Sequence, residues 1–101
     1  MKVVESEKDW WFLLEEDGAL YLDGNYEASF VGYDCMIRLT AEEAVQYQKR
    51  GREFINWLAS DIQNTTPILK VSTSPYKARR ITGAIAERAL DAIEKWKVSQ
   101  C

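Results

Sequence analysis

The fold of this chain of 101 residues is decided by residues 10–39, WWFLLEEDGALYLDGNYEASFVGYDCMIRL. Apolar runs alternate in this stretch with short polar segments that contain glycine, at 17–18, 23–25 and 32–34. Asp17-Gly18 is the strongest of these turn signals, because a two-residue hairpin turn needs the positive φ that glycine accepts. Between the turns, side chains alternate between an apolar face and a partly polar face, as they do in strands. We therefore predict a four-stranded antiparallel meander at about 10–39.

A helical pattern begins directly after the predicted strands. Thr40 and Glu43 have the spacing of a capping box, in which each side chain accepts a hydrogen bond from the other residue's backbone N–H. Apolar residues then recur at helical spacing as far as Ile62, which predicts an amphipathic helix at about 41–63. Gly51 lies in the apolar stripe, where glycine costs ~1 kcal/mol relative to alanine, so we expect another backbone to approach it closely.

A second helix is predicted at about 75–97, because Ser74-Pro75 has the form of an N-cap followed by a first-turn proline. Its apolar stripe is wide enough to contact two surfaces, the sheet and either the first helix or a second subunit. The linker between the helices holds a possible short fifth strand at 68–71. Strands followed by helices predict an α+β fold.

The composition predicts a single domain over residues 1–101, with flexible ends at 1–8 and 98–101. With 47% apolar and 29% charged residues, the chain has the composition of an ordered globular protein. The sequence has no stretch of ~18 uncharged apolar residues and no signal-peptide pattern. We therefore expect a cytoplasmic protein that does not contact a membrane.

Histidine is absent from the sequence, and cysteine occurs only at Cys35 and Cys101. The commonest general base and metal ligand is thus missing, which excludes a histidine-dependent triad and a histidine-ligated metal. Two distant cysteines are too few for a zinc site or a disulfide framework, so we expect free thiols, with Cys35 packed in a strand. We expect neither an enzyme nor a metal or other cofactor.

Charge is divided between the two halves of the chain. Residues 1–45 hold eleven acidic and three basic residues, a net charge of −8, whereas residues 46–101 hold ten basic and five acidic residues, a net charge of +5. The division coincides with the change from a strand pattern to a helical pattern. The two charges should therefore lie on different structural layers.

Cations crowd the predicted start of the second helix, where the helix dipole disfavours them. We expect an anion nearby, supplied by the acidic half of the same chain or of a partner chain. The alternative is an external phosphate or carboxylate, held by hydroxyl and guanidinium groups. The candidate anion-binding residues are Ser72, Thr73, Ser74, Lys77, Arg79 and Arg80.

Three other chemistries have weaker patterns. Polar residues between Asp23 and Asp34 match a calcium loop loosely, but Ala28 stands where the sharp turn needs glycine, and an alternating strand accounts for the spacing. No paired spacing singles out two carboxylates for acid–base catalysis. A basic stripe could contact nucleic acid, but the net charge of −3 argues against it.

Large aromatic residues that leave the predicted core indicate a contact surface. Trp57 falls off the apolar arc of the first helix, and alternation places at least one of Trp10 and Trp11 outside the core. Tryptophan, tyrosine and arginine are the residues that most often anchor protein interfaces. The alternative is that Trp57 folds over a neighbouring side chain. The candidate interface residues are Trp10, Trp11, Trp57, Tyr76 and Arg50.

These patterns favour a small non-catalytic protein-interaction module, expected as a homodimer, that uses exposed aromatic residues and segregated charge. One alternative is an anion-binding module at Ser72–Arg80, for a phosphate ligand or nucleic acid. Another is an acidic inhibitor of a basic partner, of the immunity-protein or antitoxin type, since a half with a charge of −8 would steer association with a cationic protein. A carboxylate-based enzyme has the least support.

Overall fold

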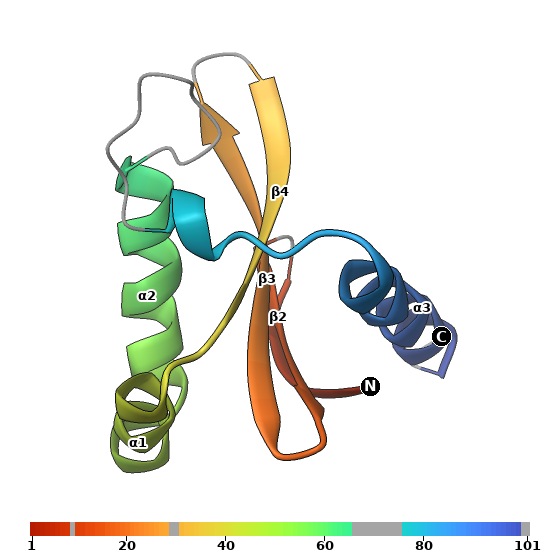
Figure 1. Cartoon of the computed structure of the whole chain (residues 1–101), viewed down its shortest axis with the longest axis horizontal. Coiled ribbons are helices and arrows are strands. Elements are labelled where there is room, and N and C mark those ends of the chain that lie inside the picture. The colour runs from red at the N-terminus through yellow and green to blue at the C-terminus, as the bar shows by residue number, and fades with distance from the viewer. Residues whose placement is uncertain (9, 29–30, 66–75, 100–101) are drawn as a thin grey trace.

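The computed structural model describes residues 1–8, 10–28, 31–65 and 76–99. Its strands form one antiparallel sheet in sequence order: β1 (Lys2–Glu7), β2 (Trp11–Glu16), β3 (Ala19–Ala28) and β4 (Val31–Arg38). The helices are α1 (Ala41–Arg50), α2 (Arg52–Thr65), the short 3-10 helix η1 (Lys77–Arg79) and α3 (Ala84–Ser99) (Figure 1). The predicted α+β fold, a four-stranded meander followed by amphipathic helices, is confirmed.

The hairpin between β2 and β3 is the one that the Asp-Gly signal predicts. Asp17 and Gly18 have φ angles of 51° and 82°, and a type I′ turn requires positive φ at both central residues. Glu16 pairs with Ala19 beside the turn, and the same register continues along both strands. This turn therefore sets which side chains of β2 and β3 share a face of the sheet.

The segment 23–25 is not a turn, contrary to the sequence-based prediction. β3 runs through it without a break, and Gly24 pairs with Cys35 of β4. Glycine has a different purpose here, because an added Cβ would lie 2.1 Å from the hydroxyl oxygen of Tyr26. Residues 32–34, also predicted as a turn, belong to β4. Cys35 is a buried free thiol in that strand, as expected.

The remaining strand, β1, comes from the segment that was predicted as a flexible end. Lys2–Glu7 pair with β2, with one register shift between Val3 and Glu5. The meander therefore begins at residue 2 instead of about residue 10. Two of the predicted strands are merged in β3, so the number of strands is still four.

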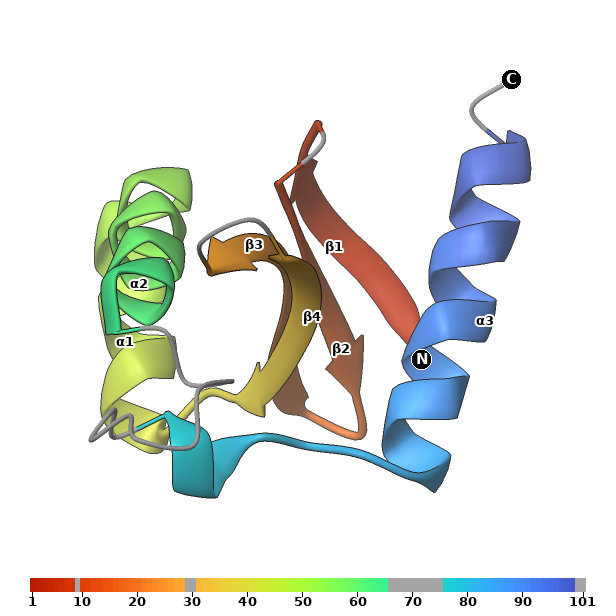
Figure 2. The same ribbon diagram turned by 90° about the horizontal axis from the view of Figure 1, so that it is seen from above.

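The helices cover both faces of the sheet, with α1 and α2 on one side and α3 on the other (Figure 2). The larger core lies between the sheet and α2 and includes Leu13, Leu22, Ile37, Ile55 and Leu58. The smaller core lies between the sheet and α3 and includes Leu14, Tyr21, Met36, Ala89 and Ile93. Because α1 and α2 lie on the opposite side of the sheet (Figure 2), the wide apolar stripe of α3 does not pack against them.

Gly51 interrupts the first predicted helix and divides it into α1 and α2. It has a φ of 64° and a ψ of −143°, and its N–H donates to the carbonyl of Tyr47 at 2.7 Å. The expectation that another backbone approaches Gly51 is wrong for the described part of the chain, where nothing beyond its own chain neighbours lies within 4 Å of an added Cβ. Glycine is favoured here because it ends a helix at a positive φ that other residues adopt with strain.

The second long helix begins at Ala84, well after the predicted start near 75. Before it, residues 80–83 form an extended strap that carries the chain from the α2 side of the sheet to the α3 side (Figures 1 and 2). The N–H of Ile81 in this strap donates to the carbonyl of Met36 on β4 at 2.8 Å. The predicted cap at 74–75 and the possible strand at 68–71 lie outside the described residues. None of the helices in the described ranges combines the length and the hydrophobicity of a transmembrane span.

Candidate functional site

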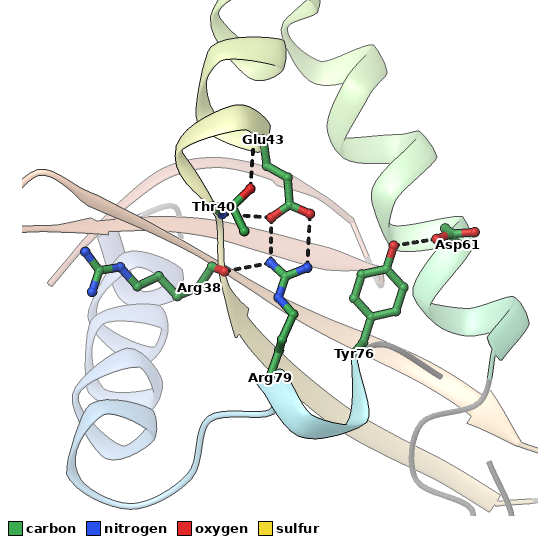
Figure 3. Close-up of polar contacts among 6 residues, drawn as sticks. All are labelled: Arg38, Thr40, Glu43, Asp61, Tyr76 and Arg79. Carbon is green, nitrogen blue, oxygen red and sulfur yellow. Dashed lines mark hydrogen bonds and ion pairs between the residues drawn. The ribbon is translucent and has the colours of Figure 1, made fainter. Parts of the chain in front are cut away.

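Arg79, one of the predicted anion-binding residues, is bound to the acidic half of its own chain (Figure 3). Its guanidinium donates to both carboxylate oxygens of Glu43, at 2.5 and 3.1 Å, and to the carbonyl of Arg38 at 2.9 Å. Burial raises the pKa of Glu43, but hydrogen bonds from Arg79 and Thr40 outweigh it and hold the pKa below its usual range. The expectation that the acidic half supplies the anion is confirmed for Arg79.

The other predicted anion-binding residues do not gather at a helix start in the described part of the chain. Lys77 lies in η1, and Arg80 lies in the strap, before α3 begins. The guanidinium of Arg80 is 3.5 Å from the backbone carbonyl oxygen of Asp34. Three candidates lie outside the described residues: Ser72, Thr73 and Ser74.

Further ion pairs join the acidic half of the chain to the basic half, among them one between Arg52 and Glu5 at 3.8 Å. Arg52 of α2 donates to Glu7 of β1 at 2.6 Å, and Arg88 of α3 donates to both carboxylate oxygens of Glu16, at 2.7 and 3.0 Å. The hydrogen bond from Arg88 lowers the pKa of Glu16. Ion pairs between the acidic and basic halves of the sequence thus connect the helices on both sides to the sheet.

Two of the predicted interface residues are buried. Trp11 is fully buried, and its indole N–H donates to the side-chain oxygen of Asn56 at 3.0 Å. Tyr76 is also buried, and its hydroxyl donates to Asp61 (Figure 3). Burial raises the pKa of Tyr76, and the bond to Asp61 adds to the effect. Trp11 and Tyr76 are therefore core residues, contrary to the prediction.

The other predicted interface residues are accessible. Trp57 is 53% exposed and stacks on the ring of Phe54 with 5.8 Å between centroids. Arg50 is exposed as well, with its guanidinium 5.9 Å from the centroid of Phe54. Trp57 is thus both exposed and folded over a neighbour. Trp10 is half-buried and lines the cleft described next.

An open cleft of about 500 Å³ lies between α3 and the sheet. A volume of this size accommodates a long side chain or a small ligand. A smaller hollow of about 250 Å³ continues from it towards the strap. We call the two together the α3 cleft. Its aromatic and acidic lining residues are Trp10, Phe12, Trp96, Glu7, Asp23, Asp34 and Glu87.

The register of the sheet brings Asp23 and Asp34 to the same face. Asp23 pairs with Met36, and Asn25 pairs with Asp34, so the two acidic residues are diagonal neighbours across β3 and β4. The sequence pattern placed both residues at the ends of one loose calcium loop, with Asp23 in a turn, and so did not predict that they lie on neighbouring strands. The pair could have been predicted if residues 23 and 25 had been read as alternate positions of one strand, paired with residues 36 and 34 of the next strand.

Asp23 is half-buried in the α3 cleft and has no ion pair or hydrogen bond within the described part of the chain. Burial, with the neighbouring carboxylate of Asp34, raises the pKa of Asp23 to about 7. A cation placed near both carboxylates would offset both effects, because an opposite charge favours the ionised form. The arrangement is thus suited to binding positive charge between aromatic walls.

The weak calcium pattern takes a different form in the structure. Asp23 and Asn25 lie on β3 and Asp34 lies on β4, so these residues do not form one loop. In the described ranges, no group of three or more acidic or cysteine side chains is placed to hold a metal ion.

Comparison of the chain with protein-family models, with curated proteins and with solved structures gives no match.

Proposed function

We propose that this chain is a non-catalytic protein-interaction module whose α3 cleft binds a basic segment of a protein partner. The proposal rests on one observation: Asp23 and Asp34 lie together in an aromatic-lined cleft, and neither carboxylate has an ion pair within the described residues. Other carboxylates at the junctions between layers are paired, such as Glu43 with Arg79. A lysine or arginine side chain from a partner would neutralise the cleft in the same way.

The chemistry of the lining supports a basic occupant. Aromatic faces attract ammonium and guanidinium groups, and three aromatic residues line the same cleft as the carboxylates. Among the residues that the structure describes, four acidic side chains line the α3 cleft against three basic ones, Lys8, Arg80 and Lys97. The whole chain carries a net charge of −3, which would also favour approach of a cationic protein. An acidic inhibitor of a basic partner is one form of such a module.

The anion-binding alternative at 72–80 has less support. Arg79 already binds both oxygens of Glu43 and is not available to an external anion without breaking that pair. Arg80 lines the α3 cleft near two carboxylates. A phosphate at this position would meet negative charge of the protein as well as the remaining cations.

Tryptophan fluorescence can test the proposal, because Trp10 and Trp96 line the α3 cleft. We expect a short peptide of alternating lysine and glycine to change the fluorescence on titration, and a glutamate–glycine peptide to have no effect. Asp34→Asn should weaken binding of the lysine peptide about tenfold, since an unpaired partner cation loses its counter-charge. Asp34 is exposed, so the substitution leaves the core intact.

Asp17→Asn is the matched control. It makes the same change of charge at the hairpin turn, where Asn-Gly is also a favoured pair. The control should bind the lysine peptide as the native protein does. Equal affinities of the Asp17 and Asp34 variants, or no binding by the native protein, would contradict the proposed function.

Self-association remains part of the proposal and depends on a different surface. Trp57 is 53% exposed, and Arg50 shares its neighbour Phe54, a combination that is common at interface anchors. We expect light scattering at micromolar concentration to give twice the chain mass of 11.7 kDa, and Trp57→Ala to give the monomer mass. A monomer mass for the native protein at every concentration would remove the homodimer.

A further inference from the structure

One cation already lies on the aromatic wall of the α3 cleft. The ammonium nitrogen of Lys97 is 5.6 Å from the centroid of Phe12, within the range of a cation–π interaction. Trp96 packs edge-on against the same ring, with 5.4 Å between centroids and an interplanar angle of 81°. The ring of Phe12 is therefore held by one residue of α3 and capped by the next.

Phe12 is also the aromatic residue placed nearest to the carboxylate pair by the strand register. It lies directly opposite Asp23 across β2 and β3, and residues opposite each other in an antiparallel pair have neighbouring side chains on one face. The side chains of Phe12 and Asp23 are therefore neighbours on the face of the sheet that lines the cleft. Both features attract the same kind of group.

We propose that the ring of Phe12 is the cation subsite of the α3 cleft, that it takes the ammonium of a partner lysine, and that Lys97 occupies it in the free protein. This inference rests on the proposed function and goes further by naming the group that is bound and the residue that competes with it. Lys97 is exposed and near the end of α3, so its side chain can leave the ring without disturbing the core. The ammonium of Lys97 on the ring of Phe12 shows how the ammonium of a partner lysine would bind.

The test compares two lysines of the same helix. Lys97→Met removes the competitor, whereas Lys95→Met removes an equal charge from an exposed side chain that pairs with Asp91. We expect Lys97→Met to bind the lysine–glycine peptide about two- to fivefold more tightly than the native protein, the strength of an exposed cation–π contact. Lys95→Met should bind it as the native protein does. Equal affinities of the two variants would overturn the inference.

A second comparison separates occupancy of the ring from simple loss of charge. In a Phe12→Leu background the ring is absent, so the gain from Lys97→Met should vanish; a gain that persists would show that only charge matters and would overturn the inference. A peptide with acetylated lysines should not bind, and binding equal to that of the unmodified peptide would also overturn it. Thermal unfolding of each variant checks that Phe12→Leu still folds.

Failure of this inference can be told apart from failure of the proposed function. If the native protein binds the peptide and Asp34→Asn binds it about tenfold more weakly, the α3 cleft binds cations whatever the result at Lys97. If the native protein and all variants fail to bind the peptide, the proposed function fails, and the role of Lys97 fails with it.

Discussion

The carboxylate of Glu43 joins the start of α1 to the guanidinium of Arg79. It accepts a hydrogen bond from the backbone N–H of Thr40 at 2.8 Å, which completes the capping box, and two from Arg79, at 2.5 and 3.1 Å. Arg79 lies just before the strap that leads to α3. One carboxylate therefore connects the helical layer over one face of the sheet with the segment that leads to the other face.

We predict that Arg79→Met destabilises the protein by about 1–2 kcal/mol, in the range for hydrogen bonds to charged groups reduced for partial exposure. Lys49→Met, on the exposed surface of α1, should change the stability by less than about 0.5 kcal/mol. Urea unfolding measures both variants. Equal effects of the two substitutions would show that the Glu43 pair contributes nothing beyond a surface charge.

The contribution of this pair should depend on pH. The pKa of Glu43 is lower in the folded protein than in the unfolded chain. The ionised carboxylate therefore stabilises the fold at pH values above the unfolded pKa, and this stabilisation is lost as the pH falls through the folded pKa. The difference in stability between the native protein and Arg79→Met should therefore shrink between pH 7 and pH 3. A difference that stays constant over this range would contradict the ion pair.

The expected effect of Gly51→Ala on stability differs in sign between one continuous helix, as predicted from the sequence, and the two helices of the structure. In one continuous helix at 41–63, alanine would be more stable than glycine by ~1 kcal/mol. At the observed φ of 64° and ψ of −143°, a conformation that strongly favours glycine, alanine should instead cost about 1–3 kcal/mol. Thermal or urea unfolding gives the sign directly, and stabilisation would mean that α1 and α2 are one helix.

Gly51 also shows which features could be predicted from the sequence. The hairpin at Asp17-Gly18 and the capping box of Thr40 and Glu43 were predictable because each depends on residues within four positions of one another. The break at Gly51 was not, because the apolar stripe continues on both sides of it. The α3 cleft was not either, since it depends on the register of β3 and on a strap that carries α3 to the second face of the sheet.

Gly24→Ala should destabilise the protein although Gly24 lies inside a strand. The new Cβ would lie 2.1 Å from the hydroxyl oxygen of Tyr26, a residue only 2% exposed and therefore unable to move away freely. Overpacking of a core typically costs about 1–3 kcal/mol. In a Tyr26→Leu background the clash is relieved, so the cost of Gly24→Ala measured by urea unfolding should fall. The same cost in both backgrounds would exclude the contact as its cause.

Asp23→Asn should stabilise the protein at high pH more than at low pH. Burial and Asp34 raise the pKa of Asp23 to about 7, whereas the unfolded value is about 3.9. Between about pH 4 and pH 7 the folded carboxyl keeps a proton that the unfolded chain has lost, so its contribution to stability falls as the pH rises and is constant above about 7. Asparagine does not ionise, so Asp23→Asn removes this fall in stability with rising pH.

Thermal unfolding at pH 5 and pH 8 measures the effect, with Asp17→Asn as the control of equal charge. The melting temperature of Asp23→Asn relative to the native protein should be higher at pH 8 than at pH 5, and the control should show no such difference. The charged groups that share the cleft and could alter the titration are Glu7, Lys8, Asp34, Arg80, Glu87 and Lys97. If Asp23→Asn shifts the melting temperature equally at both pH values, the pKa of Asp23 is not raised by its burial in the cleft.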